Sequence, residues 1–171
     1  MIFDLSDGIA IALSSLAWFA VSFVVGWWGA GWPSTRVQQT GPLTRIRSWE
    51  DDGRWWQRHL RVRAWKDRVP EAGGLFGGLV KRRLPSRSTP DLELFRRETI
   101  RAERVHWLIL ASTPLHLLWC GPGLAAAMIA FGVAFTVPFI VIQRSNRGRL
   151  DRLIERRSAR RVRRWAAASI G

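Results

Sequence analysis

The sequence predicts an all-α integral membrane protein, with about three transmembrane helices, interfacial amphipathic helices and a basic C-terminal helix, in a single domain over residues 1–171. Residues 105–143 form a run of 39 residues without Lys, Arg, Asp or Glu. At about 1.5 Å per helical residue this run is roughly 58 Å long, or about two crossings of a 30 Å hydrocarbon layer. A second apolar run, residues 9–28, has 20 uncharged residues. All 27 basic residues lie in two segments, 36–104 and 144–171.

The apolar run 9–28 predicts a transmembrane helix over residues 8–30. It is expected to be retained, because Asp4 and Asp7 precede it where a cleaved signal peptide has positive charge. Amphipathic side chains that favour the headgroup level end it: Trp27, Trp28 and Trp32. Small residues in the same region either allow close helix contact or face lipid: Gly26, Gly29 and Gly31.

The distribution of charge predicts the orientation. Residues 1–35 contain no Lys or Arg, and basic residues flank the apolar runs on one side, which is the positive-inside pattern. We therefore expect a multi-pass protein with its N-terminus outside and its C-terminus in the cytoplasm. The formal charge of +14 is explained by this pattern without nucleic acid. It also favours anionic lipid headgroups, at about 1 kcal/mol per basic residue near the surface.

Residues 31–104 are predicted to be cytoplasmic or interfacial. Within them Trp55, His59, Val62 and Lys66 share one face of a predicted helix, and arginines cover its other faces. A basic helix with aromatic residues is typical of the membrane interface. The glycines of segment 73–78 indicate either a flexible connector or a loop that faces substrate.

The charge-free run 105–143 predicts a helical hairpin with spans 105–120 and 122–143, bent near Cys120. We expect Cys120 to pack at the bend. One cysteine excludes an internal disulfide. The basic tail, 144–171, is predicted to be a helix in solvent or against headgroups. Three tail residues form a short apolar stripe: Leu150, Leu153 and Ile154.

Glu103 and His106 are three residues apart, about 60° around a helix, so their side chains can reach the same space. Such a pair suits general-base chemistry, with the carboxylate orienting the imidazole that takes a proton from a hydroxyl. The alternative is that both residues are structural partners of nearby arginines. Glu98 is expected to pair with Arg101 or Arg97 instead. One Glu-x-x-His supplies only two ligands, so no metal site is predicted.

A closed hairpin would bring the segments 103–107 and 143–149 to the same membrane face. Arg144, Asn146 and Arg147 are then placed to receive an anionic or polar headgroup, because guanidinium groups suit phosphate or carboxylate. The alternative is that they are cytoplasmic anchors, and this is the interpretation favoured for two further residues: Arg149 and Arg152.

Three blocks carry a resemblance to a known family: Trp65-Lys66-Asp67 with Pro70-Glu71; Glu98-x-x-Arg101-Ala102-Glu103-x-x-His106-Trp107; and Pro138 to Leu150 with Gln143-Arg144-x-Asn146-Arg147. From about residue 55 to 153 the sequence resembles the glycosyl-4,4'-diaponeurosporenoate acyltransferases, small membrane enzymes of staphyloxanthin-type carotenoid synthesis, and their actinobacterial relatives. It departs from that pattern at Ser145, where an aromatic residue is common, and at Gly148, where proline is common.

The resemblance implies transfer of a long acyl chain, with acyl-CoA as the expected co-substrate and no other cofactor, at the inner leaflet of a bacterial cell membrane. The acceptor is a sugar hydroxyl of a glycolipid or glycosylated carotenoid. His106 is expected to be the base and Glu103 its orienter, while Lys66, Arg144 and Asn146 serve the oxyanion or headgroup. The full expected substrate-binding set is Lys66, Asp67, Glu98, Arg101, Trp107, Gln143, Arg144, Asn146 and Arg147.

Two other functions remain open at this point. A non-catalytic membrane adaptor that binds anionic lipid or a partner protein explains the charge but gives no reason for Glu103 and His106. A membrane-tethered nucleic-acid binder explains only the charge. A homo-oligomer that builds one pocket from two chains also remains open. Convergence of Glu103, His106 and Arg144 on one cavity would favour the enzyme.

Overall fold

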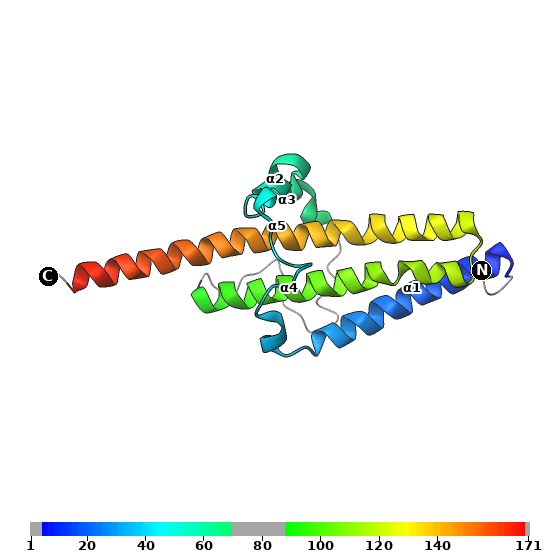
Figure 1. Cartoon of the computed structure of the whole chain (residues 1–171), viewed down its shortest axis with the longest axis horizontal. Helices are drawn as coiled ribbons and strands as arrows, with labels where there is room; N and C mark the ends of the chain where they lie inside the picture. The colour runs from blue at the N-terminus through cyan, green and yellow to red at the C-terminus, as the bar shows by residue number, and fades with distance from the viewer. Residues whose placement is uncertain (1–4, 70–87, 170–171) are drawn as a thin grey trace.

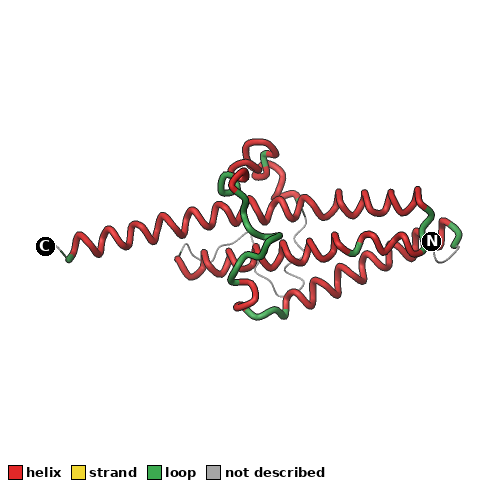
Figure 2. The backbone as a smooth tube through the Cα atoms, viewed as in Figure 1, coloured by secondary structure: helices red, strands yellow, loops and turns green. Residues whose placement is uncertain are grey.

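Helices make up the fold throughout the residues that the structure, a computed structural model, describes: 5–69 and 88–169. No strand occurs among them (Figure 2). The three long helices are α1 (Asp7–Ala30), α4 (Thr89–Ala111) and α5 (Pro122–Ala168). The short ones are η1 (Ser34–Val37), η2 (Ser48–Glu50), α2 (Arg54–Leu60), α3 (Val62–Trp65), η3 (Lys66–Arg68) and η5 (Thr113–Leu118). The glycine-rich segment predicted as connector or substrate loop lies outside the described residues.

The long helices lie side by side, with α4 between α1 and α5 (Figure 1). Helices α4 and α5 form an antiparallel pair joined through η5 and the turn before Pro122, so the predicted hairpin is confirmed. The short helices α2 and α3 pack on the other side of α5. Buried Cys120 lies at the bend, as expected, with its Sγ 3.3 Å from the Ser14 hydroxyl of α1.

Two described helices, α1 and α5, are long and apolar enough to cross a membrane. Their large apolar side chains are exposed, as lipid-facing residues would be: Phe19 is 72% and Phe131 52% exposed. The third predicted span, 105–120, is α-helical only to Ala111. Pro114 lies in the first turn of η5, and a proline cannot supply the N–H that would continue the α-helix. Three transmembrane helices therefore remain a prediction.

Contact between α1 and α4 depends on a glycine. A Cβ added to Gly29 would lie 2.4 Å from Val105 Cγ2, so of the two interpretations of the small residues, close helix contact holds at this position. The Arg101 guanidinium donates to the carbonyl oxygens of Gly29 (3.0 Å) and Ala30 (2.7 Å). The last carbonyl groups of a helix have no N–H donor within the helix, so the guanidinium group of Arg101 stabilises the C-terminus of α1.

The interfacial segment differs from the single helix predicted. Arg61 has φ 46° and ψ 44°, and this left-handed residue separates α2 from α3. A right-handed helix cannot continue through such a residue, so the predicted shared face of Trp55, His59, Val62 and Lys66 is wrong. The break lets Val62, which is 1% exposed, pack on Val141 and Ile142 of α5.

The apolar stripe of the tail is covered by protein. Leu150 packs with Leu92 and Phe95 of α4, and Leu153 and Ile154 lie against the same cluster. The predicted solvent or headgroup position is therefore wrong for this stripe. The cause is that α4 begins at residue 89, early enough to run beside this part of α5.

Gly148 of α5 allows the turn before α2 to lie directly on the helix. A Cβ at this position would be 2.0 Å from the Asp52 carbonyl oxygen and 2.7 Å from the Gly53 nitrogen. We expect Gly148→Ala to lower the free energy of unfolding by about 1–3 kcal/mol, the usual cost of overpacking. Thermal unfolding in detergent measures it. Gly123→Ala is the control, because a Cβ there meets nothing within 4 Å; equal melting temperatures for the two variants would contradict this packing.

Candidate active site

Four charged residues are buried together where α4, α5 and the segment before α2 meet, and we call them the charged cluster: Glu50, Glu103, Arg144 and Arg147. Glu50 ends η2, and Glu103 lies in α4. The two arginines lie one turn apart on α5. Arg144 is 7% exposed and the other three are 0% exposed. Full burial of charged side chains is rare unless they are paired, so their contacts decide what they do.

Each carboxylate in the cluster is paired with a guanidinium group. Arg144 Nη1 lies 2.7 Å from Glu103 Oε1, and Arg144 Nε lies 2.8 Å from Glu50 Oε2. Arg144 Nη2 also donates to Glu50 Oε1, which makes that pair bidentate. Arg147 Nη1 is 2.5 Å from Glu103 Oε2. The forked, charge-assisted Arg144–Glu50 pair belongs to the strong class of hydrogen bond, whereas Arg147 and Glu103 form an ion pair.

The cluster also holds the loop that follows η1. Arg144 donates to the carbonyl oxygens of Leu43 (2.9 Å) and Arg45 (2.8 Å), and Arg147 donates to that of Thr44. The loop is thereby fixed to α5 through consecutive carbonyl groups.

Two indole groups also donate hydrogen bonds to the carboxylates. Trp56 Nε1 donates to Glu50 Oε2 at 2.7 Å, and Trp107 Nε1 lies 3.3 Å from Glu103 Oε1. Burial alone would raise the pKa of Glu50, but hydrogen bonds from Arg144, the Arg47 backbone N–H and Trp56 outweigh it and lower that pKa below its ordinary value. Glu50 is therefore ionised at neutral pH, as its pairing with Arg144 requires.

His106 lies one turn beyond Glu103 on α4. Its ring stacks on Phe139 of α5, with ring centroids 4.7 Å apart and planes at 23°. The contacts described for the Glu103 carboxylate are those to Arg144, Arg147 and Trp107. The structural pairing of Glu103 with arginines is thus confirmed, while its role as orienter of His106 stays a prediction.

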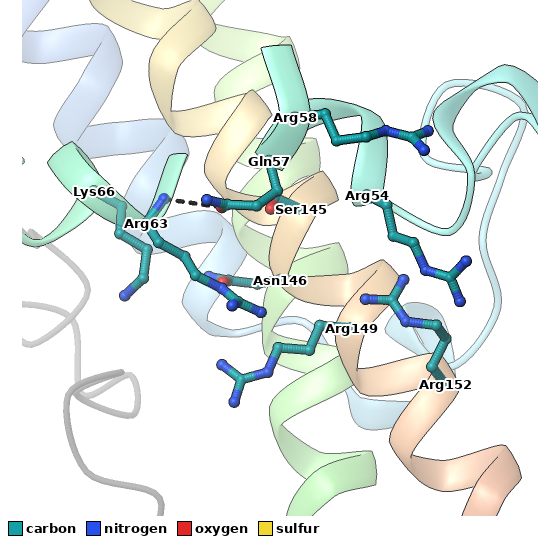
Figure 3. A pocket seen from close by; sticks show the side chains of 10 residues that line it. Arg54, Gln57, Arg58, Arg63, Lys66, Ser145, Asn146, Arg149 and Arg152 are labelled. Carbon is teal, nitrogen blue, oxygen red and sulfur yellow. Dashed lines mark hydrogen bonds between the residues drawn. The ribbon is translucent and has the colours of Figure 1, made fainter. Parts of the chain in front are cut away.

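A basic pocket of about 180 Å³ opens between α2, α3 and α5, and we call it the cationic pocket (Figure 3). Its lining residues are Gly53, Arg54, Gln57, Arg58, Arg63, Lys66, Ser145, Asn146, Arg149 and Arg152. Six of these ten are basic and none is acidic. Figure 3 shows the side chains of Arg63, Asn146 and Arg149 close together, whereas Arg58 points away.

The positive charge of the cationic pocket is only partly compensated. Lys66 Nζ pairs with Asp67 at 2.6 Å. The pKa of Arg152 is lowered, first by its burial and then by the nearby charge of Arg54, although Asp52 opposes the shift. A guanidinium group whose pKa is lowered in part by a neighbouring positive charge favours a bound anion.

A second hollow, of about 370 Å³, lies at the C-terminal end of α1, and we call it the aromatic pocket. It is lined by Trp28, Trp32, Arg36, Gly41, Pro42, Leu43, Thr44, Arg104, Trp107 and Leu108. The Arg36 guanidinium carbon lies 5.6 Å from the centre of the Trp32 ring. Thr44 and Trp107 contact the charged cluster from this side, while Gly53 and Ser145 border it on the side of the cationic pocket.

The predicted site residues separate into groups. Glu103, Arg144 and Arg147 meet in the charged cluster. Lys66 and Asn146 line the cationic pocket, and Trp107 lines the aromatic pocket. Arg144 and Arg147 are thus engaged by carboxylates and carbonyl groups, so headgroup binding by them remains a prediction.

The other predicted binding residues lie apart from these groups. Arg101 Nε is 3.2 Å from Glu98 Oε1, which confirms the expected pair. Arg101 also contacts the end of α1, as described above. Gln143 is buried at 3% exposure. Among the described residues no three His, Cys, Asp or Glu side chains are grouped as a metal site would require.

Sequence reasoning missed several contributors. Glu50 was not among the predicted site residues, yet it is fully buried and pairs with Arg144. Gln57 and Arg63 line the cationic pocket and are joined by a hydrogen bond from the Arg63 backbone N–H to Gln57 Oε1, 3.1 Å long. The signal in the sequence that could have indicated Glu50 was chemical. An arginine at the end of an apolar span needs a carboxylate partner if it is buried, and the segment before α2 contains one.

Two helices long and apolar enough to cross a membrane, with a buried charged cluster and two pockets beside them, indicate a membrane protein. The chain belongs to the glycosyl-4,4'-diaponeurosporenoate acyltransferase family, which it matches over residues 41–156, more than half of its length.

Curated relatives carry the same name. The protein from Staphylococcus aureus (strain USA300) is 28% identical over 142 residues, which cover 82% of this chain and 85% of the relative. The protein from Staphylococcus haemolyticus (strain JCSC1435) is 32% identical over 123 residues, 68% of each chain. No solved structure matches the chain.

Proposed function

We propose that the chain is a membrane acyltransferase that moves a long acyl chain from an acyl thioester, such as acyl-CoA, to a sugar hydroxyl of a glycosylated carotenoid or another glycolipid at the inner leaflet. The observation that carries the proposal is the position of His106 relative to the cationic pocket. His106 stacks on Phe139, and Asn146 of the pocket lies seven residues further along α5. Seven residues make about two helical turns, so Phe139 and Asn146 lie on the same face of α5, about 10 Å apart along its axis.

The cationic pocket is the proposed donor site. An acyl thioester of coenzyme A or of a phosphopantetheine arm carries phosphate, and the guanidinium groups of Arg63 and Arg149 suit phosphate oxygens. Lys66 adds a third cation at the side of the pocket nearest η3. A phosphate held there directs the acyl chain along α5 toward the apolar helices.

The aromatic pocket is the proposed acceptor site. Its volume of about 370 Å³ lies within the range of roughly 300–1,000 Å³ that is usual for small-molecule sites. Trp28, Trp32 and Trp107 offer apolar ring faces to a sugar, and Arg104 offers hydrogen-bond donors to its hydroxyls. The neighbouring exposed apolar side chains of α1 suit the lipid part of the acceptor.

The proposed chemistry is a direct acyl transfer. His106, next in sequence to Trp107, takes the proton of the sugar hydroxyl while the oxygen attacks the thioester carbonyl. The C–S bond then breaks, and the leaving thiolate takes the proton from the imidazolium. Asn146 is proposed as a donor to the oxyanion. Glu103 acts as a positioning residue, because its ion pairs fix α4 against α5.

The test gives the detergent-purified protein a labelled myristoyl-CoA and a glucosylated carotenoid extract, with ester formation followed by chromatography and mass spectrometry. We expect ester with the unaltered chain. Arg63→Ala should raise the KM for myristoyl-CoA about tenfold, since a charge-assisted hydrogen bond contributes about 1.5–3 kcal/mol. The exposed Arg161→Ala is the matched control. Binding to anionic vesicles without ester formation would support the adaptor instead.

A further inference from the structure

The outer part of α5 carries an ordered row of arginines, which we call the arginine face: Arg149, Arg152, Arg156, Arg160 and Arg163. At 3.6 residues per turn these positions fall within about 80° of the helix circumference. The first two line the cationic pocket, and the last three are exposed. A continuous cationic row therefore begins in the proposed donor site and runs outward along one helix.

The three outer arginines of the arginine face lie far along α5 from its apolar part. Helix α5 is unbroken from Pro122 to Ala168 and projects past the start of α4 (Figure 1). Beyond Gln143, the end of the charge-free run, Arg156 lies about 20 Å and Arg163 about 30 Å further along the axis. Headgroup attraction falls off within a Debye length of about 8–10 Å. If α5 leaves the lipid along this axis, the outer arginines lie in solvent, where a soluble partner can reach them.

The volume of the cationic pocket limits which ligand it can hold. At about 180 Å³ it is below the range of roughly 300–1,000 Å³ usual for sites that hold a whole drug-sized ligand. It suits a phosphate group better than a complete nucleotide. A phosphopantetheine arm attached to a protein carries its thioester on a single phosphodiester, and the protein at its base can supply the acidic surface that a cationic row needs.

We propose that the arginine face docks an acidic acyl carrier protein, with the phosphate of its phosphopantetheine arm in the cationic pocket and its thioester directed toward His106. This inference rests on the proposed acyltransferase function and specifies the donor. The sugar oxygen bonds to the acyl carbon, the carbon–sulfur bond breaks, and the carrier leaves as its free thiol with the proton that His106 removed. The carrier thiol is thus regenerated without an oxidant or reductant.

Binding tests the docking separately from catalysis. The full-length protein in detergent is immobilised, and a myristoyl-loaded acyl carrier protein is passed over it. The triple variant Arg156→Ala, Arg160→Ala, Arg163→Ala should raise the Kd at least about tenfold. The matched control Arg157→Ala, Arg161→Ala, Arg164→Ala removes the same charge from the neighbouring side of α5 and should change the Kd less than about threefold. Equal weakening by both variants would overturn the proposal.

Kinetics separate this inference from the proposed function. In the transfer assay, the arginine-face variant should raise the KM for the loaded carrier about tenfold and leave the KM for myristoyl-CoA unchanged, because free coenzyme A does not reach the outer arginines. An unchanged carrier KM would overturn the docking and leave the acyltransferase proposal intact. Absence of ester from both donors would overturn the proposed function. Displacement of the carrier by mixed-sequence RNA, or retention of anionic vesicles that depends on the same arginines, would assign the face to those ligands instead.

Discussion

Replacing His106 by glutamine is expected to slow acyl transfer by about 10²–10⁴-fold, the usual contribution of a general base. Glutamine keeps a polar group of similar length near Phe139 but cannot take the proton of a sugar hydroxyl at neutral pH. The KM values for donor and acceptor should change little, because the proposed phosphate and sugar contacts come from other residues. Steady-state assays of kcat and KM in detergent measure both.

His59→Gln is the matched control for this prediction. His59 is exposed, stacks on Trp55 and donates from Nδ1 to the Trp55 carbonyl oxygen, 3.0 Å away. Its replacement should leave kcat unchanged. Full activity of His106→Gln in a correctly folded protein would remove the proposed base.

Replacing Arg144 by methionine is expected to lower the free energy of unfolding by about 3–5 kcal/mol, because it breaks a buried ion pair by removing one partner. Glu50 loses its bidentate guanidinium and Glu103 loses one of its two guanidinium partners, while both carboxylates stay fully buried. The carbonyl groups of Leu43 and Arg45 lose their donor as well. Thermal unfolding in detergent, followed by the loss of monodisperse protein, measures the change.

Two further variants are controls for this prediction. Arg161→Ala removes an exposed arginine of the same helix and should leave the melting temperature unchanged. Arg144→Lys keeps the charge but not the planar fork, so it should restore only part of the stability. A melting temperature of Arg144→Met equal to that of the control would show that the charged cluster does not hold the fold together.

Much of the fold follows from one-dimensional signals. Runs without charge predicted the helices that can span, since a hydrocarbon layer selects by length and hydropathy. The hairpin followed from a run too long for one crossing. The break at Arg61 was not predictable in this way, because a single left-handed residue leaves the helical pattern around it intact. The burial of Leu150 also depends on where its partner helix begins, which periodicity does not reveal.

The candidate site was predictable only where topology determines it. A hairpin must bring Glu103 near Arg144 and Arg147, and the structure places them in contact. Spacing on α4 also suggested that Glu103 orients His106. Spacing within one helix cannot show whether the carboxylate pairs with this imidazole or with two guanidinium groups from another helix. Glu50 reaches the cluster through a loop without regular periodicity, so no pattern in the sequence indicated its distance from Arg144.

The charged cluster imposes an order on the biogenesis of the protein. During synthesis Glu50 and Glu103 leave the ribosome before Arg144 and Arg147 exist, so a nascent chain that stops before α5 carries two carboxylates whose final counterions are missing. Only insertion of the last apolar helix supplies them. The charged cluster can therefore form only after α5 has been synthesised, and a chain truncated before this helix would leave both carboxylates without their guanidinium partners.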